Sequence, residues 1–365
     1  MMPKFSRIVS VLTFATVACL LACTIAAADY SESFSFSGDR LTVANLIGGV
    51  VVKGGGDTFE VKVRVRGSDA STGIVTFDEE SDALSIVFPT DKHKRYVYPE
   101  MESNRTSMSF NTSSDRGILS SLISAISGSD KIQVSRSGSG LQVWADLEIT
   151  VPEGRSLVIE NGVGSIAANN VTGDLILDGS SGSVTAIAID GDLGVDTGSG
   201  DVLVEKIHGK LSVDTGSGDV EGFDLRVSRV LVDTGSGDVQ LNQVETDALD
   251  IDTGSGDVIA LDVVAENASI DTGSGDVKLS LVEMGDGKFV VDTGSGRIAL
   301  LVPDNMSATV NADTGSGGID YNLTGDVDVR HKERNELRLV VGGGSARVDL
   351  DTGSGGISLR NISGS

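Results

Sequence analysis

The pentapeptide Asp-Thr-Gly-Ser-Gly recurs along the second half of the chain, and its spacing limits what the chain can fold into. The steps between successive copies are 18, 19, 19, 19, 21, 21 and 38 residues. A fixed period of this length is typical of a stacked repeat architecture. The step of 38 is two periods, which predicts one coil that has lost its motif, with its turn near residues 340–346. The copies begin at Asp196, Asp214, Asp233, Asp252, Asp271, Asp292, Asp313 and Asp351, and degraded copies begin at Asn161 and Asp178.

Apolar residues alternate with polar ones on both sides of each motif, as in Leu211 and Val213 before one copy and Val202 and Val204 after another. A period of two predicts strands with one buried face. Each unit is therefore expected to contain a strand, a tight Gly-Ser-Gly turn, a second strand and a looser turn. A unit this short buries its apolar face only against neighbouring units. The sequence predicts an all-β fold, a single-stranded β-solenoid (parallel β-helix) with coils of about 19 residues.

The alternation also places the motif's side chains. Thr215 is expected to point inward, where its hydroxyl can bond the backbone of a neighbouring coil, and Asp214 is expected to point outward. The glycines are expected to close the turn through positive φ values. Asp-Thr-Gly-Ser also surrounds the catalytic aspartate of pepsin-like proteases, but those enzymes need two aspartates that share a proton. Eight equivalent copies indicate a structural corner instead.

The chain divides into three parts. Residues 1–28 predict a signal peptide, with Lys4 and Arg7 before an apolar run. Residues 29–156 predict an N-terminal β capping region with a Ser-rich insertion at 89–140, in which 117–127 is either a short helix or a loop. Residues 157–365 form the β-solenoid repeat domain.

Export places the protein in the periplasm, the cell envelope or at the cell surface. Cleavage after Ala28 would leave a protein without cysteine, because Cys19 and Cys23 both precede it. Two alternatives keep the chain on a membrane. The run before Cys23 resembles a bacterial lipobox, which would make Cys23 a lipidation site, and an uncleaved apolar segment is long enough to span a bilayer.

The chain carries 53 acidic against 28 basic residues, a net charge of −25, which argues against a nucleic-acid partner. Carboxylates on either side of the repeated turn would stack in rows and repel one another. Two explanations remain open: they accept hydrogen bonds from turn N–H groups, or they hold Ca²⁺. The candidate Ca²⁺ ligands are Asp196, Asp201, Asp214, Asp219, Asp233, Asp238, Asp252, Asp257, Asp271 and Asp276.

A β-helix can also carry a carbohydrate-active enzyme. The repeat domain offers acids in excess and no tryptophan, since the single Trp144 precedes it. No copy of the motif differs as a catalytic copy should. The sequence therefore assigns no catalytic residue and no cofactor other than Ca²⁺.

The order of segments resembles the bacterial putative adhesin family of exported β-strand-repeat proteins, related to the head-domain auto-transporter adhesin-like proteins. The segments are the opening "LTVANLIGGVVVKGG", the bridging "ADLEITVPEGRSLVIENGVGSI", the serial "VDTGSGDV" units and the closing "GGGSARVDLDTGSGGISL". This resemblance implies a β-solenoid at the envelope or surface and no catalytic residues.

The leading interpretation is a non-enzymatic, adhesin-like or structural scaffold of the bacterial envelope, whose partner is a surface or envelope polysaccharide or protein. The alternatives are a calcium-stabilised surface binding protein and a carbohydrate-active β-helix enzyme. A membrane contact is expected only through an N-terminal lipid anchor.

Overall fold

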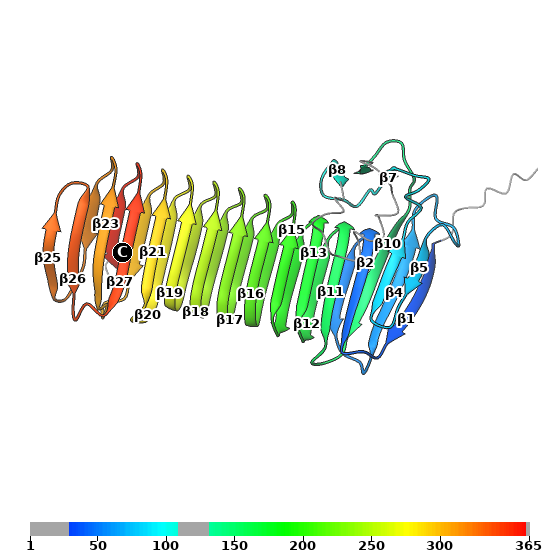
Figure 1. The fold of residues 1–365 in the computed structure, drawn as a ribbon, viewed down its shortest axis with the longest axis horizontal. Coiled ribbons are helices and arrows are strands. Elements are labelled where there is room, and N and C mark those ends of the chain that lie inside the picture. The colour runs from blue at the N-terminus through cyan, green and yellow to red at the C-terminus, as the bar shows by residue number, and fades with distance from the viewer. Residues whose placement is uncertain (1–28, 109–130, 363–365) are drawn as a thin grey trace, which may run out of the picture.

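The computed structural model describes residues 29–108 and 131–362, which form a rod of stacked strands (Figure 1). The expected signal peptide, Cys23 and the segment 117–127 lie outside the described residues. Among the described residues, no helix has the length and apolar character needed to cross a membrane. The regular structure is a continuous series of strands, most of them parallel, so the predicted all-β solenoid is confirmed.

The centre of the rod consists of coils that pair in register with their neighbours. Face 1 denotes the strand segments that lead into each Gly-Ser-Gly turn, and face 2 denotes the segments that follow it. On face 1, Asp214 lies opposite Asp233 and Thr215 opposite Thr234. The central strands are β11 (Ser156–Val163), β12 (Ile166–Thr172), β13 (Leu175–Ser181), β14 (Val184–Asp190), β15 (Leu193–Thr197), β16 (Val202–Thr215), β17 (Val220–Thr234), β18 (Val239–Thr253), β19 (Val258–Thr272), β20 (Val277–Met284), β21 (Lys288–Thr293) and β22 (Ile298–Val302).

The second turn of each unit differs from the expected loose loop. In β16 to β19 one strand of 14 or 15 residues runs from face 2 to face 1 without a break. The direction of the side chains changes at one residue per coil that has a left-handed backbone although it is not glycine. These residues, one in each of six successive coils, are Asn170, Ala188, Lys206, Asp224, Gln243 and Asp262. The strand pairing continues through this second corner, so no loop is needed there.

The variation in repeat length also arises at the second corner. Gly209 pairs with Val227 and Lys210 with Arg229, which leaves Ser228 as the additional residue of the first 19-residue coil. A longer link, Gly285–Gly287, separates β20 from β21 in the 21-residue coil. The Gly-Ser-Gly corner is constant while the second corner absorbs the additional residues.

A row of buried threonines joins the coils at the Gly-Ser-Gly corner. Thr253 Oγ1 donates a hydrogen bond to Gly237 O of the preceding coil at 3.0 Å and accepts one from Gly256 N of its own turn at 3.1 Å. The same pair of bonds recurs at Thr234 and Thr272. These side chains are at most 1% exposed, so each hydroxyl satisfies backbone groups that water does not reach. The predicted inward threonine and outward aspartate are both confirmed.

The prediction that the turn glycines adopt positive φ is wrong. No glycine of the Asp-Thr-Gly-Ser-Gly turns has a left-handed backbone. Glycine is needed because the turns stack closely: a Cβ on Gly256 would overlap the carbonyl group of Gly237, and a Cβ on Gly237 would overlap that of Gly218. The constraint comes from the neighbouring coil and not from the turn itself.

The N-terminal end of the rod adds antiparallel strands to the stack. The strands β2 and β3 form a coil that pairs in parallel with β11 and β12, so the expected domain boundary at residue 157 falls next to a coil that comes from residues 40–54. Face 1 then ends with β6 and β5, and face 2 ends with β10, β4 and β1. The bounds are β1 (Tyr30–Phe36), β2 (Arg40–Ile47), β3 (Val50–Gly54), β4 (Phe59–Arg66), β5 (Thr76–Glu79), β6 (Ala83–Val87) and β10 (Trp144–Val151).

The described part of the Ser-rich insertion forms a separate three-stranded sheet of β7 (Arg95–Val97), β9 (Ile132–Ser135) and β8 (Arg105–Met108). It lies above the turns of the first coils (Figure 1). Glu102 accepts hydrogen bonds from Ser183 N and Ser183 Oγ at 3.2 and 2.6 Å. A loop of the insertion thus contacts the turn that follows Asp178, which begins one of the degraded motif copies.

The C-terminal part of the rod is assembled out of chain order. The strands β27 (Ala346–Thr352) and β28 (Ile357–Asn361) lie between β21 and β22 on one side and β23 (Ala308–Thr314) and β24 (Ile319–Asn322) on the other. The interpretation of the 38-residue step as two stacked periods is therefore wrong. Asp351 stacks between Asp292 and Asp313, because the last motif fills a place that the chain had left open.

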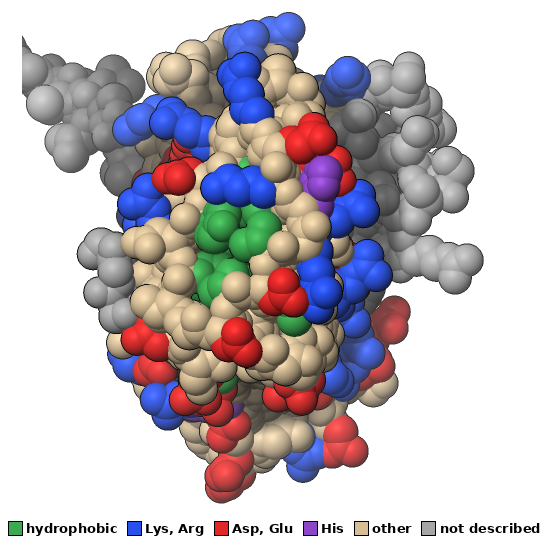
Figure 2. Space-filling model, turned by 90° about the vertical axis from the view of Figure 1, so that its left-hand side faces the viewer, with side chains coloured by type: hydrophobic (Ala, Val, Ile, Leu, Met, Phe, Trp, Pro, Cys, Tyr) green, Lys and Arg blue, Asp and Glu red, His purple; other side chains and the backbone are tan. Residues whose placement is uncertain are grey.

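The intervening residues form an antiparallel hairpin of β25 (Val327–Lys332) and β26 (Glu336–Val341), and β26 pairs with β23. Residues 340–346 are thus the end of this hairpin and its link to β27, not a degraded turn. Figure 2 looks onto this end of the rod, with apolar side chains at its centre and Lys and Arg side chains beside them. Lys332 Nζ lies 4.5 Å from the centre of the Tyr321 ring.

The close stacking of the turns makes a direct prediction. We expect Gly256→Ala to lower the free energy of unfolding by about 1–3 kcal/mol, the range for forcing an added methyl into a packed site. Ser255→Ala in the same turn is the matched control, because Ser255 is exposed, and its effect should stay within about 0.5 kcal/mol. Chemical denaturation of the two variants measures both values. Equal stability of the variants would contradict the explanation.

Candidate functional site: acidic rows and a corner groove

The motif aspartates form one continuous row along face 1. Register pairing extends this row beyond the motif at both ends, to Glu160 at one end and Glu336 at the other. Because each member directly opposes the next, like charges stack at the strand spacing of about 4.8 Å. In spatial order the row, called row 1, contains Glu160, Asp178, Asp196, Asp214, Asp233, Asp252, Asp271, Asp292, Asp351, Asp313 and Glu336.

Ionisation is less favourable at three members of row 1, Asp252, Asp292 and Asp313, than for free aspartate. Burial raises the pKa of Asp252, and the carboxylates of Asp271 and Asp233 raise it further. Burial also raises the pKa of Asp292, with smaller contributions from Asp271 and Asp351. At these positions the ionised carboxylate therefore disfavours the folded rod at neutral pH.

The aspartates after each turn form a second row, row 2, in a different chemical setting. Asp257 Oδ1 accepts a hydrogen bond from Asp276 N of the next coil at 2.7 Å, and Asp238 Oδ1 accepts one from Asp257 N at 2.8 Å. Asp276 ends the series by accepting from Arg297 N at 2.7 Å. The same bonds begin at Asp201 and Asp219. The backbone thus supplies a donor to each carboxylate of row 2.

The ten candidate Ca²⁺ ligands are divided between the two rows, five in row 1 and five in row 2. Within residues 29–108 and 131–362, no group of three His, Cys, Asp or Glu side chains has the arrangement of a metal site. The row 2 oxygens bond turn N–H groups, as one of the two sequence explanations expects, although the bonded N–H belongs to the next coil. Calcium binding by the rows stays a prediction.

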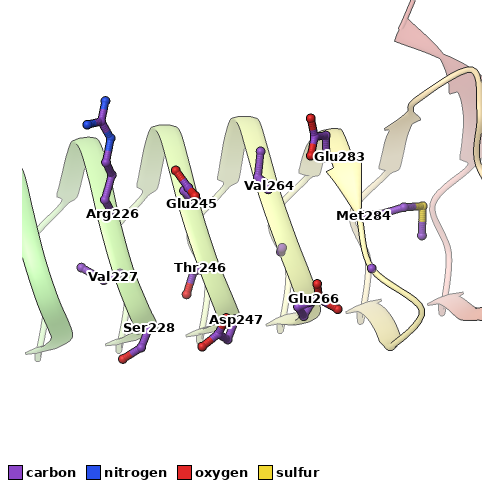
Figure 3. A pocket seen from close by; sticks show the side chains of 12 residues that line it. Arg226, Val227, Ser228, Glu245, Thr246, Asp247, Val264, Glu266, Glu283 and Met284 are labelled. Atoms are coloured by element: carbon purple, nitrogen blue, oxygen red, sulfur yellow. The ribbon is translucent and has the colours of Figure 1, made fainter.

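A groove with a volume of 480 Å³ runs along the second corner across four coils. Figure 3 shows Arg226, Glu245, Val264 and Glu283 on successive coils along one side, and Ser228, Asp247 and Glu266 along the other. Its floor is mostly apolar and buried, with Val227 4%, Thr246 7% and Ala265 3% exposed. The groove can receive an elongated chain that lies parallel to the rod and presents positive charge.

Sequence reasoning missed this groove. Its four acids do not belong to the repeated motif, and stacking of the second corners of successive coils brings them together. Glu245 and Glu283 pair in register with residues of the adjacent strands, while Asp247 and Glu266 follow the buried floor residues. The available signal was limited to Asp247 and Glu266, which are acids at the same place in two successive units.

The two rows predict opposite effects of removing a carboxylate. We expect Asp252→Ala to raise the free energy of unfolding at neutral pH by less than about 1 kcal/mol, because it removes repulsion along row 1. The pKa of Asp252 is higher in the folded state than in the unfolded state. The gain in stability from Asp252→Ala is therefore present above the folded-state pKa and disappears as the pH falls below the unfolded-state pKa. Asp257→Ala should instead cost about 1 kcal/mol, through loss of the bond from Asp276 N. Denaturation curves at several pH values test both, and the same sign for both variants would refute the distinction.

Calcium binding has its own measurement. If the rows hold Ca²⁺, calorimetric titration at millimolar Ca²⁺ should release or absorb heat, and the melting temperature should rise. Mg²⁺ is the control for screening of charge. Absence of both heat and a melting shift would remove the calcium prediction.

Comparison with known proteins bears on the fold and the family. A model of the Toastrack DUF4097 family matches residues 55–360. No curated protein matches the chain. A solved "putative cell adhesion protein" from Clostridium sporogenes is 11% identical over 92% of this chain and 100% of its own, with a TM-score of 0.18.

Two further solved structures are similar to the chain. A "putative adhesin" from Bacteroides fragilis is 11% identical over 92% of this chain and 97% of its own, with a TM-score of 0.31. A "putative adhesin" from Parabacteroides distasonis is 13% identical over 91% and 97%, with a TM-score of 0.33. The family match covers nearly all of the described rod and confirms the family expected from the order of its sequence segments. The chain belongs to the Toastrack DUF4097 family.

Proposed function

We propose that this protein is a non-enzymatic, exported scaffold of the bacterial cell envelope that presents its long faces for adhesion. The observation that carries the proposal is the uniformity of the coils. Row 1 and row 2 repeat the same side chain in the same backbone setting from coil to coil. A catalytic centre concentrates special residues at one place, whereas a repeated surface offers many weak contacts that act together.

Two features support an adhesive surface in particular. The rod exposes carboxylates along face 1, and the corner groove adds further acids beside an apolar floor. A partner with spaced positive charges, or a polysaccharide bridged through cations, would meet equivalent contacts on several coils. The names of the similar solved proteins are consistent with this role.

Surface presentation is tested on intact producing cells. Lys278 is exposed on face 2 and should react with a membrane-impermeant amine reagent before the cells are broken. A cytoplasmic protein, labelled only after lysis, is the control. Labelling of Lys278 only after lysis would contradict a surface role.

The mass of the mature N-terminus, beginning at Asp29 or at a lipid-modified Cys23, then distinguishes a free from an anchored protein. The purified protein is also incubated with acidic polysaccharides. Cleavage of their chains, measured as new chain ends, would overturn the non-enzymatic proposal.

A further inference from the structure

The place occupied by β27 and β28 is a built site for a strand-turn-strand segment. On face 1, β27 pairs in parallel with β21 on one side and β23 on the other. On face 2, β28 pairs with β22 and β24 in the same way. The strand β21 does not pair directly with β23, and β22 does not pair directly with β24, because the C-terminal segment lies between them. Residues 346–361, here called the closing coil, therefore complete the ladder between two coils that precede them in the chain.

The site is specific for the repeat motif. Val348, Leu350 and Leu359 of the closing coil are at most 2% exposed in the rod interior. Thr352 Oγ1 donates to Gly296 O at 2.8 Å, and Thr314 Oγ1 donates to Gly355 O at 2.7 Å. The occupant must therefore present alternating apolar residues, a threonine and the close-stacking glycines in one register.

A single short hinge connects the closing coil to the rest of the described structure. The hinge is Gly342–Ser345, which crosses from β26 to β27 past the start of β23. Gly342 and Gly344 have φ values of 57° and 69°, a left-handed backbone that glycine allows. The coils of β16 to β19, in contrast, are each held by the chain at both ends. Within the described residues, the closing coil has this one connection to the rod, so a change in the hinge is enough to let it leave its place.

We propose that the place between the coils of β21–β22 and β23–β24 also binds the closing coil of a second copy of this chain, so that two copies exchange closing coils and form a dimer. Every contact of the closing coil is the same whether it comes from its own chain or from the other. The equilibrium then depends on protein concentration and on the hinge, because exchange replaces the bent hinge by an extended one. Such a dimer would join two rods near their C-terminal ends.

A pair of cysteines reports which chain supplies the closing coil. Ala299 and Ser358 are register partners on β22 and β28, and directly opposed strand positions lie within the range of a disulfide. In Ala299→Cys/Ser358→Cys, with Cys19 and Cys23 changed to Ser, oxidation links one chain to itself in the closed monomer and two chains after exchange. We expect a covalent dimer on a non-reducing gel whose fraction rises with the protein concentration during refolding.

The control pair is Gln240→Cys/Ile259→Cys, which joins two central coils and should link only within one chain. A strictly monomeric product of the first pair at every concentration would refute the exchange, as would an equal dimer fraction for both pairs. A second variant, deletion of Gly343 and Gly344, halves the hinge and should raise the dimer fraction measured by light scattering, because a short hinge favours the extended connection of the exchanged form. A dimer fraction no higher than that of the unaltered chain would also overturn the proposal.

Discussion

The close contact between successive Gly-Ser-Gly turns determines the rest of this structure. A threonine hydroxyl donates to the carbonyl group of the preceding coil and accepts from the N–H group of its own turn, so one buried side chain satisfies a backbone group in each of two coils. The glycines allow the turns to approach until a side chain would overlap the neighbouring carbonyl. With this distance fixed, the strand segments that lead into the turns stack in register, so that Asp214 lies opposite Asp233 and Asp233 opposite Asp252, while the register shifts occur at the second corner.

Stacking in register brings carboxylates close together, and the two rows differ in how the resulting repulsion is offset. In row 2 each carboxylate meets a backbone N–H group of the next coil, which offsets the charge. In row 1, burial and neighbouring carboxylates raise the pKa of Asp252 and Asp292. Ionised carboxylates at these two positions weaken the fold, so contact with a partner explains them more easily than stability does, in keeping with the proposed adhesive surface.

The sequence predicts the repeated part of the fold because periodicity and alternation are local properties. Leu211, Val213 and Thr215 have the expected orientation, since a period of two follows from strand geometry alone. Three features could not be found in this way. The role of Gly256 depends on the adjacent turn, the place of Asp351 depends on a strand that returns from the hairpin, and the corner groove depends on residues of four coils. Each of these features depends on contacts between different units, and the sequence of a single unit does not show which other units lie next to it.

The restriction of length variation to the second corner has a consequence for how such a chain can change over generations. Units differ in length through Ser228 and the Gly285–Gly287 link, and neither of these changes the Gly-Ser-Gly corner at which the threonines stack. At each end of the rod the stack continues into antiparallel pairs, β10 with β4 and β23 with β26, and these pairs do not depend on the number of units between them. Duplication or loss of one whole unit would therefore change the reach of the molecule by one strand spacing, about 4.8 Å, with the same cross-section. The length of such a rod would therefore change in discrete steps with the number of its units.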